Sequence, residues 1–296
     1  MIRAYKVAEH TFHLELPDGS PLWDRLGQYA PFEVAPVRDP VFSLSIVGDL
    51  PLKSREIVYD APVEPGETVV KLYRSEDDWL FEMAPTDERP MAGRMRTGLD
   101  FKRGELCCDS RRVIDAVFCI NNSLMLLYAF CTATMGTLEM HASVIGNSGR
   151  GFLFLAKSGT GKSTHSSLWL KNVPGSELIN DDNPIVRVWP DGRIMVYGSP
   201  WSGKTPCYRN VECPVGAFVK IRRSPENRIT PLSLLEAYAA IYSSCSGFKA
   251  CRPIGDGLHQ SIEAAVVNVP CYVLDCRPDR EAAMVCSTEV LGKSDE

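Results

Sequence analysis

The chain of 296 residues lacks three features that would each indicate a class of protein. Its 11 cysteines include no Cys-x-x-Cys pair, which argues against a zinc site or disulfide framework, and their odd number is typical of reduced thiols. No block of lysine and arginine occurs and the net charge is −5, so a nucleic-acid partner has no electrostatic support. The first seven residues, MIRAYKV, have neither the charged nor the apolar region of a secretion signal. We therefore expect a cytoplasmic protein with neither a nucleic-acid nor a membrane partner.

The composition is that of a globular protein, and the length suits one large domain or two smaller ones. Proline and glycine recur before residue 105, and residues 69–74 and 79–83 have the alternating pattern of strands. We predict a β-rich N-terminal domain over residues 1–105 and a second domain over residues 106–296. Residues 85–104 are rich in arginine and lysine, and we expect them to form an exposed connection or a mobile lid.

A long apolar helix is predicted over residues 111–137. A membrane span is one interpretation, but Asn121, Asn122 and Ser123 interrupt the apolar run, and the remaining stretch is shorter than a bilayer requires. We expect a helix buried between the two halves of the chain.

The most informative stretch is GFLFLAKSGTGKST at residues 151–164, an apolar strand that leads into a glycine-rich turn. Backbone N–H groups of such a turn close around phosphate oxygens, with the lysine on the β- and γ-phosphates and the following serine on Mg²⁺. A helix predicted over residues 160–171 adds its positive N-terminus. The alternative is a Gly/Ser-rich turn that happens to contain lysine. The residues predicted to bind nucleotide are Ser158, Gly159, Thr160, Gly161, Lys162, Ser163 and Thr164.

A hairpin is predicted immediately before this loop, because two apolar runs are joined by the turn residues 146–149. The strand that begins near His141 would then lie antiparallel to the strand that feeds the loop, which implies a mixed sheet. The hairpin also brings His141 to the end of the sheet that carries the loop. We predict a functional role for His141, the alternative being a structural histidine.

Two adjacent carboxylates, Asp181 and Asp182, end a short strand about 20 residues after the loop lysine. Alone, such a pair is typical of a solvated turn. After a phosphate loop it suits a kinase, in which one carboxylate orients Mg²⁺ and the other accepts the proton of an attacking hydroxyl. The sequence leaves open which aspartate has which task, and we predict metal binding by Ser163, Asp181 and Asp182.

A Gly/Ser/Pro-rich loop over residues 196–209 carries Trp201, Lys204 and Arg209. Cations beside a triphosphate neutralise charge that develops during transfer, so we predict catalytic roles for Lys204 and Arg209. The alternative is a tryptophan that anchors the loop to the core, with solvated cations. Further along, His259 is expected near the start of a helix, and Lys220, Arg222 and Arg223 at the exposed end of a strand.

In their order and spacing, HAS at residues 141–143, the loop, the paired aspartates and GKT at residues 203–205 resemble the superfamily of HPr kinase/phosphorylase and ATP-dependent phosphoenolpyruvate (PEP) carboxykinase. The resemblance covers roughly residues 138–276. It implies an α/β fold: a mixed β-sheet P-loop kinase core of the HPr kinase/PEP carboxykinase type with a smaller β-rich N-terminal domain. It also implies that His141 lies near the transferred phosphoryl group and that Lys204 lies near phosphate and metal.

These features predict a phosphotransferase that uses ATP and Mg²⁺, with Mn²⁺ as an alternative, and phosphorylates a hydroxyl of serine in a protein or peptide, or of a small molecule. The donor, whether ATP, ADP or pyrophosphate, stays open. We expect a homo-oligomer whose N-terminal domain recognises the acceptor. One alternative is a non-catalytic nucleotide sensor or peptide-maturation partner. Another is a PEP carboxykinase-type decarboxylase, which is disfavoured because the substrate arginine and the Glu-Asn-Thr-Arg element of that family are not found.

Overall fold

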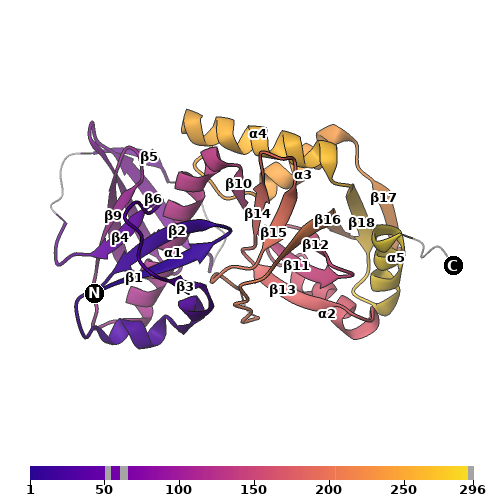
Figure 1. Cartoon of the computed structure of the whole chain (residues 1–296), viewed down its shortest axis with the longest axis horizontal. Helices are drawn as coiled ribbons and strands as arrows, with labels where there is room; N and C mark the ends of the chain where they lie inside the picture. The colour runs from indigo at the N-terminus through magenta and orange to yellow at the C-terminus, as the bar shows by residue number, and fades with distance from the viewer. Residues whose placement is uncertain (51–54, 61–65, 204, 293–296) are drawn as a thin grey trace. The chain divides into compact units, whose positions relative to one another are not determined.

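The computed structural model describes residues 1–50, 55–60, 66–203 and 205–292, which divide into two compact units (Figure 1). Unit 1 is Met1–Cys131 and unit 2 is Thr132–Glu296. Each unit contains a mixed β-sheet and at least one helix, so the fold class is α/β. The division follows the long apolar helix, whereas the sequence interpretation placed it at residue 105, inside a strand of the first sheet.

The sheet of unit 1 has the strand order β3-β1-β2-β4-β9-β8-β7-β6-β5. β4 pairs in parallel with β2 and β9, and the other described pairs in this sheet are antiparallel. Two short 3-10 helices lie between β2 and β3: Pro21–Arg25 and Gly27–Phe32. The strands are β1 (Ile2–Val7), β2 (His10–Glu15), β3 (Glu33–Val34), β4 (Ser43–Ile46), β5 (Glu56–Tyr59), β6 (Val69–Arg74), β7 (Asp78–Ala84), β8 (Gly93–Gly98) and β9 (Arg103–Cys108).

The prediction of an exposed connection or lid over residues 85–104 is wrong for residues 93–98 and 103–104, which are in strands. β8 and the start of β9 lie within the sheet, with β8 paired on both sides. The burial of β8 alternates, so that Met95 and Thr97 are buried while the arginines between them lie on the other face. Arg94 Nε donates to Glu82 at 2.7 Å and Arg96 pairs with Glu105. Cross-strand carboxylates thus neutralise Arg94 and Arg96, two of the basic residues that suggested exposure.

The helix α1 (Val113–Thr132) packs on the sheet of unit 1. Tyr128 donates its hydroxyl hydrogen to the carbonyl of Val7 at 3.0 Å and meets Phe12 edge to face. Among the described residues, Val113–Met135 is long and apolar enough to cross a membrane by length and composition. That is weak support for a membrane span, because 56% of its apolar window is buried within the protein and the core helix of a soluble protein passes the same test.

The sheet of unit 2 has the order β10-β14-β15-β16-β12-β11-β13, with β18 beside β16 and β17 beside β18. The pairs β12–β16 and β16–β18 are parallel, and the other described pairs in this sheet are antiparallel. The strands are β10 (Thr137–Glu139), β11 (Ala142–Asn147), β12 (Arg150–Leu155), β13 (Glu177–Asp182), β14 (Ile185–Val188), β15 (Ile194–Tyr197), β16 (Glu212–Arg223), β17 (Arg228–Pro231) and β18 (Cys271–Cys276).

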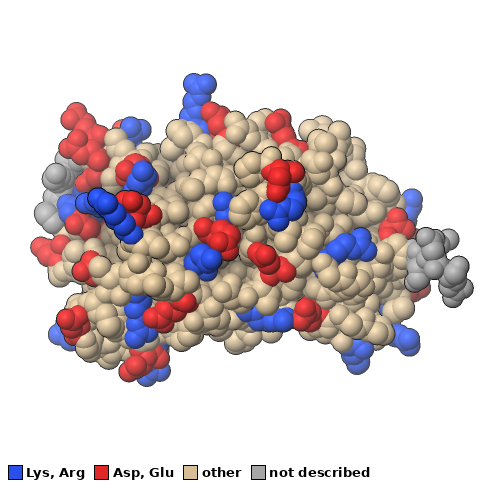
Figure 2. All heavy atoms as spheres, in the orientation of Figure 1, with Lys and Arg blue, Asp and Glu red and all other residues tan. Residues whose placement is uncertain are grey.

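Helices complete unit 2. α2 (Lys162–Asn172) packs with α5 (Arg280–Leu291) over a core in which Trp169 lies 5.5 Å from Phe152 and 5.6 Å from Phe154, ring centre to ring centre. α3 (Leu234–Ser244) and α4 (Arg252–Asn268) pack on each other and on β10, β12 and β14. A 3-10 helix, Ala133–Met135, precedes β10. On the face shown in Figure 2, Lys and Arg are interspersed with Asp and Glu, without a continuous basic patch.

The predicted hairpin before the phosphate loop is confirmed. β11 and β12 are antiparallel, with Asn147 opposite Arg150 and Ala142 opposite Leu155. Because β12 also pairs in parallel with β16, the sheet is mixed as the sequence indicated.

The prediction that His259 lies near a helix start is wrong, because His259 lies in the middle of α4, where it contacts Tyr238 and Glu263. Gly255 and Gly257 resembled a turn in the sequence but are helical. A Cβ atom on Gly257 would lie 2.5 Å from the carbonyl oxygen of Ala133. This glycine therefore serves close packing rather than a turn.

Candidate functional site

The loop between β12 and α2 has the geometry of an anion-binding turn. Gly159 and Gly161 have φ angles of 70° and 127°, which residues with a Cβ rarely adopt. No side chain caps the N-terminus of α2, so the first N–H groups of the helix remain open to a ligand. The helix begins at Lys162 rather than at residue 160, because the two positive φ angles keep the preceding residues out of the helix.

Lys162 and His141 meet at the edge of this turn. The Lys162 ammonium lies 2.8 Å from His141 Nε2 and donates to the carbonyl oxygen of Ala156 at 3.2 Å. Burial lowers the pKa of Lys162, and the carboxylates of Asp182 and Asp181 oppose that shift. Because burial removes water from the ammonium group, an anion that binds beside Lys162 would supply hydrogen-bond acceptors in place of that water.

His141 Nε2 is also 3.1 Å from Asp182 Oδ1. A single ring nitrogen accepts from Lys162 when it carries no proton and donates to Asp182 when it does, but it cannot do both at once. Burial alone would raise the pKa of Asp182, yet the hydrogen bond and charge of His141, together with the charge of Lys162, lower it overall. Asp182 is therefore an ionised carboxylate at neutral pH.

Asp181 faces the loop serine. The Ser163 hydroxyl donates to Asp181 Oδ1 at 3.0 Å, while Asp181 Oδ2 is buried and has no hydrogen-bond partner among the described residues. Buried oxygens are normally satisfied, so an unpartnered carboxylate oxygen beside a hydroxyl suits a hard cation. No group of three His, Cys, Asp or Glu side chains within the described ranges could hold a metal by itself. Mg²⁺ needs fewer, because it takes one or two carboxylates and completes its coordination with phosphate and water.

The backbone of Asp182 is strained, since its φ of 124° is unusual for a residue with a side chain. Gly203 lies directly against it: its N–H donates to Asp181 O at 2.6 Å, and an added Cβ would lie 3.0 Å from Asp182 Cβ. The close approach of the loop after β15 to the end of β13 therefore favours glycine at position 203.

These groups line one cavity of about 350 Å³. Its walls contain nine of the predicted site residues: His141, Ser158, Gly159, Gly161, Lys162, Ser163, Thr164, Asp181 and Asp182. Gly203 completes the lining and was not predicted, because its importance lies in a contact with Asp182 that spacing does not reveal.

The three remaining predicted site residues have separate outcomes. Thr160 lines a neighbouring cavity rather than this one. Lys204 lies outside the described residues, so its predicted role stays a prediction. Arg209 pairs with Glu177 and donates to the carbonyl of Leu178 at 2.7 Å, at the start of β13. That is about 10 Å along the strand from the aspartates, so Arg209 is held away from the cavity and we do not assign it to the site.

Arg223 contributes to the site in a way that the sequence interpretation missed. It ends β16, which runs parallel to β12 with Lys220 opposite Leu155, so β16 continues past the end of β12 and carries Arg223 alongside the loop. Its guanidinium donates to the carbonyl oxygens of Gly159 and of Thr160, the latter at 3.2 Å. The available signal was its place at the end of a strand beside the loop strand, since ligand loops gather at such ends.

Comparisons with known proteins add little to this geometry. No family model matches the chain, and no curated protein matches it. Among solved structures it is similar to the HPr(Ser) kinase/phosphatase from Coxiella burnetii, at 13% sequence identity and a TM-score of 0.32 over 52% of this chain and 88% of that one. A likeness this weak indicates a distant relationship at most and carries no argument about function.

One buried carboxyl near the site gives a pH prediction. Glu139 is 1% exposed and neither of its oxygens has a hydrogen-bond partner among the described residues. Burial, reinforced by the charge of Asp182, raises its pKa from 4.5 to about 8. Between these values the folded protein keeps a proton that the unfolded chain releases, so stability falls as pH rises through that window.

Glu139→Gln removes this titration. At pH 8 we expect the variant to exceed the wild type in unfolding free energy by about 4 kcal/mol, with the difference shrinking toward pH 4.5. Urea unfolding across that range measures it, and the exposed Glu289→Gln on α5 is the control. A difference that stays constant with pH would contradict the raised pKa of Glu139.

The strained backbone of Asp182 gives a second prediction. Asp182→Gly and Asp182→Ala both remove the carboxylate, but only glycine accepts the positive φ without strain. We expect the glycine variant to be more stable than the alanine variant by about 1 kcal/mol. Thermal unfolding of the matched pair measures this, and equal stability would mean that the conformation carries no strain.

Proposed function

We propose that this protein is an ATP- and Mg²⁺-dependent phosphotransferase that transfers the γ-phosphoryl group of ATP to a hydroxyl acceptor. One observation carries the proposal: a phosphate-type loop at an uncapped helix N-terminus, a lysine, a Ser–Asp pair and an Asp–His pair all line the same cavity of about 350 Å³. Each group alone has structural explanations. Their convergence from three segments of the chain is what phosphoryl transfer requires.

In the proposed mechanism the turn and Lys162 hold the polyphosphate. The open N–H groups of the loop and of the first turn of α2 bind phosphate oxygens, and the β- and γ-phosphates replace His141 as partners of the Lys162 ammonium. His141 Nε2 is then released from Lys162 and donates to Asp182, 3.1 Å away.

Ser163 and Asp181 would hold the metal, because their oxygens are adjacent and one carboxylate oxygen is unpartnered. Bound Mg²⁺ supplies neutralisation of the charge on the β- and γ-phosphate oxygens. Asp181 accordingly acts as a ligand, which leaves Asp182 as the base.

Asp182 accepts the proton of the acceptor. The acceptor oxygen forms a bond to the γ-phosphorus, the bond from the γ-phosphorus to the bridging oxygen breaks with its electron pair leaving on ADP, and the hydroxyl proton moves to the Asp182 carboxylate. The lowered pKa of Asp182 keeps it ionised at neutral pH, and His141 keeps it oriented. Recognition of the acceptor by the N-terminal domain, the homo-oligomer and the cytoplasmic location stay predictions from the sequence.

Lys162→Ala tests the phosphate end of the site. Loss of a charge-assisted contact should weaken ATP binding about ten- to a hundredfold in the presence of Mg²⁺. Titration calorimetry measures the affinity, with Lys171→Ala, an exposed lysine at the other end of α2, as the matched control. Equal ATP affinity in the two variants would mean that Lys162 and its loop do not bind the phosphates, and would contradict the proposal.

Asp182→Asn tests the base. We expect ATP·Mg²⁺ affinity to stay within about threefold, because the metal and phosphate contacts are intact, while turnover falls about 10²- to 10⁴-fold. ADP release with ATP, Mg²⁺ and a panel of free serine, serine peptides and HPr-like acceptors measures turnover, and the exposed Asp191→Asn serves as control. Turnover as fast as that of the wild type would exclude Asp182 as the base.

The same assay separates the alternatives. Tight ATP binding by the wild type without acceptor-dependent ADP release would favour a nucleotide sensor. Formation of phosphoenolpyruvate from oxaloacetate with Mn²⁺ would favour the decarboxylase.

A further inference from the structure

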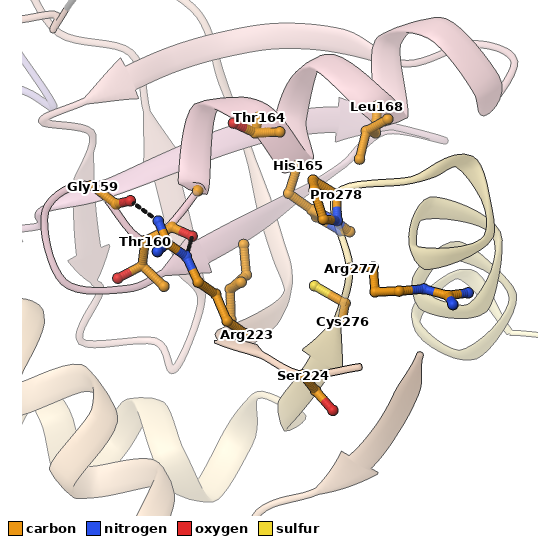
Figure 3. A pocket seen from close by; sticks show the side chains of 12 residues that line it. Gly159, Thr160, Thr164, His165, Leu168, Arg223, Ser224, Cys276, Arg277 and Pro278 are labelled. Atoms are coloured by element: carbon orange, nitrogen blue, oxygen red, sulfur yellow. Dashed lines mark hydrogen bonds between the residues drawn. The ribbon is translucent and has the colours of Figure 1, made fainter. Parts of the chain in front are cut away.

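A second cavity of about 360 Å³ adjoins the phosphate loop, and Figure 3 shows the residues that line it. It shares Gly159, Gly161 and Thr164 with the phosphate cavity, so the loop is a common wall of both. A molecule whose phosphates occupy the first cavity can therefore continue past the loop into the second. The volume is at the lower end of the range of small-molecule sites, about 300–1,000 Å³.

The lining of this cavity suits a flat, uncharged ring. Leu168, Ile221, Cys276 and Pro278 supply apolar surface from α2, β16 and the end of β18. None of the described residues that line it is an aspartate or glutamate. Of its two arginines, Arg223 is bound to carbonyl oxygens of the loop, and Arg277 turns its guanidinium away from the cavity toward Asp279 and Glu281 (Figure 3).

His165 places an unused hydrogen-bond donor in the same wall. Its Nε2 accepts from Trp169 Nε1 at 3.1 Å, and burial lowers its pKa to about 4, so the imidazole is neutral at physiological pH. Because the indole only donates, Nε2 must be the unprotonated nitrogen and Nδ1 carries the hydrogen. Nδ1 is buried and finds no acceptor among the described residues. A buried donor without a partner is costly, and ring nitrogens or sugar hydroxyls of a ligand would satisfy it.

Arg223 connects the two cavities. Figure 3 shows its guanidinium bound to the carbonyl oxygens of Gly159 and Thr160. In a planar trans peptide the C=O and N–H groups point in opposite directions. Holding the Thr160 carbonyl toward the second cavity turns the N–H of Gly161 toward the phosphate cavity, while the N–H of Thr160 donates to the carbonyl oxygen of Lys157 at 3.2 Å. The wall of the second cavity thus orients a donor of the first.

We propose that the second cavity is the subsite for the base and ribose of the nucleotide, with His165 Nδ1–H as a donor to the nucleoside and Leu168 against the base. This inference rests on the proposed function, because it takes the phosphates of the same ligand to lie in the first cavity. It identifies the donor as a nucleoside triphosphate rather than pyrophosphate, an alternative that the sequence left open.

The test compares ATP with inorganic tripolyphosphate, which has the phosphates and no nucleoside. In calorimetry of the full chain with Mg²⁺, we expect ATP to bind at least about tenfold more tightly. Leu168→Trp fills the second cavity and should abolish this preference while tripolyphosphate affinity stays within about twofold. Leu170 is on the same helix, is 44% exposed and does not line the cavity, so Leu170→Trp should keep the preference for ATP over tripolyphosphate.

His165→Phe probes the donor. It should lower the affinity for ATP about three- to tenfold, which is the value of one hydrogen bond, and leave the affinity for tripolyphosphate unchanged. An unchanged tripolyphosphate affinity also shows that the loop is still folded. Two results would overturn this inference and leave the proposed function intact. One is equal affinity of the wild type for ATP and tripolyphosphate, and the other is an equal loss of both affinities in Leu168→Trp. Binding of neither ligand would overturn the proposed function and this inference with it.

Discussion

The site depends on one constraint, the antiparallel pairing of β11 with both of its neighbours. Ala142, the first residue of β11, lies opposite Leu155 at the end of β12 and opposite Asp182 at the end of β13. This register places the glycine-rich loop after β12, the histidine before β11 and the paired aspartates side by side. A slip of one residue in either pairing would turn the side chains of the strand to the opposite face of the sheet.

The same arrangement brings several features that lower the stability of the fold close together. Asp182 has a strained backbone, Lys162 is partly desolvated, Asp181 keeps an unpartnered oxygen and Glu139 is a carboxyl without hydrogen bonds. Each of these lowers stability, and the rest of unit 2 offsets them with a close-packed core around Trp169 and the sheet beneath it. Under the proposed function, bound phosphate would supply a partner to Lys162, and a bound cation would supply one to Asp181.

Much of the site was predictable because its signals are local. The glycine spacing around Lys162 specifies a turn with positive φ angles, and the apolar run before it specifies a buried strand. The four turn residues before β12 specified a hairpin, and the hairpin brought His141 to the loop. Errors arose where a long-range contact reversed a local signal. Arg94 and Arg96 suggested an exposed segment until Glu82 and Glu105 were found opposite them.

By itself, the sequence determined the glycine-rich turn, the strand–turn–strand unit before it and the paired carboxylates that follow, since each depends on a few consecutive residues. Only the tertiary structure decided that Arg223 holds the loop carbonyls, that Gly203 lets a distant loop approach Asp182 and that Arg209 stays at the far end of β13. It alone decided, too, that His165 keeps a donor free beside a second cavity. These features depend on which strands pair and where each strand ends, and those choices are made by burial across the whole unit rather than by neighbouring residues.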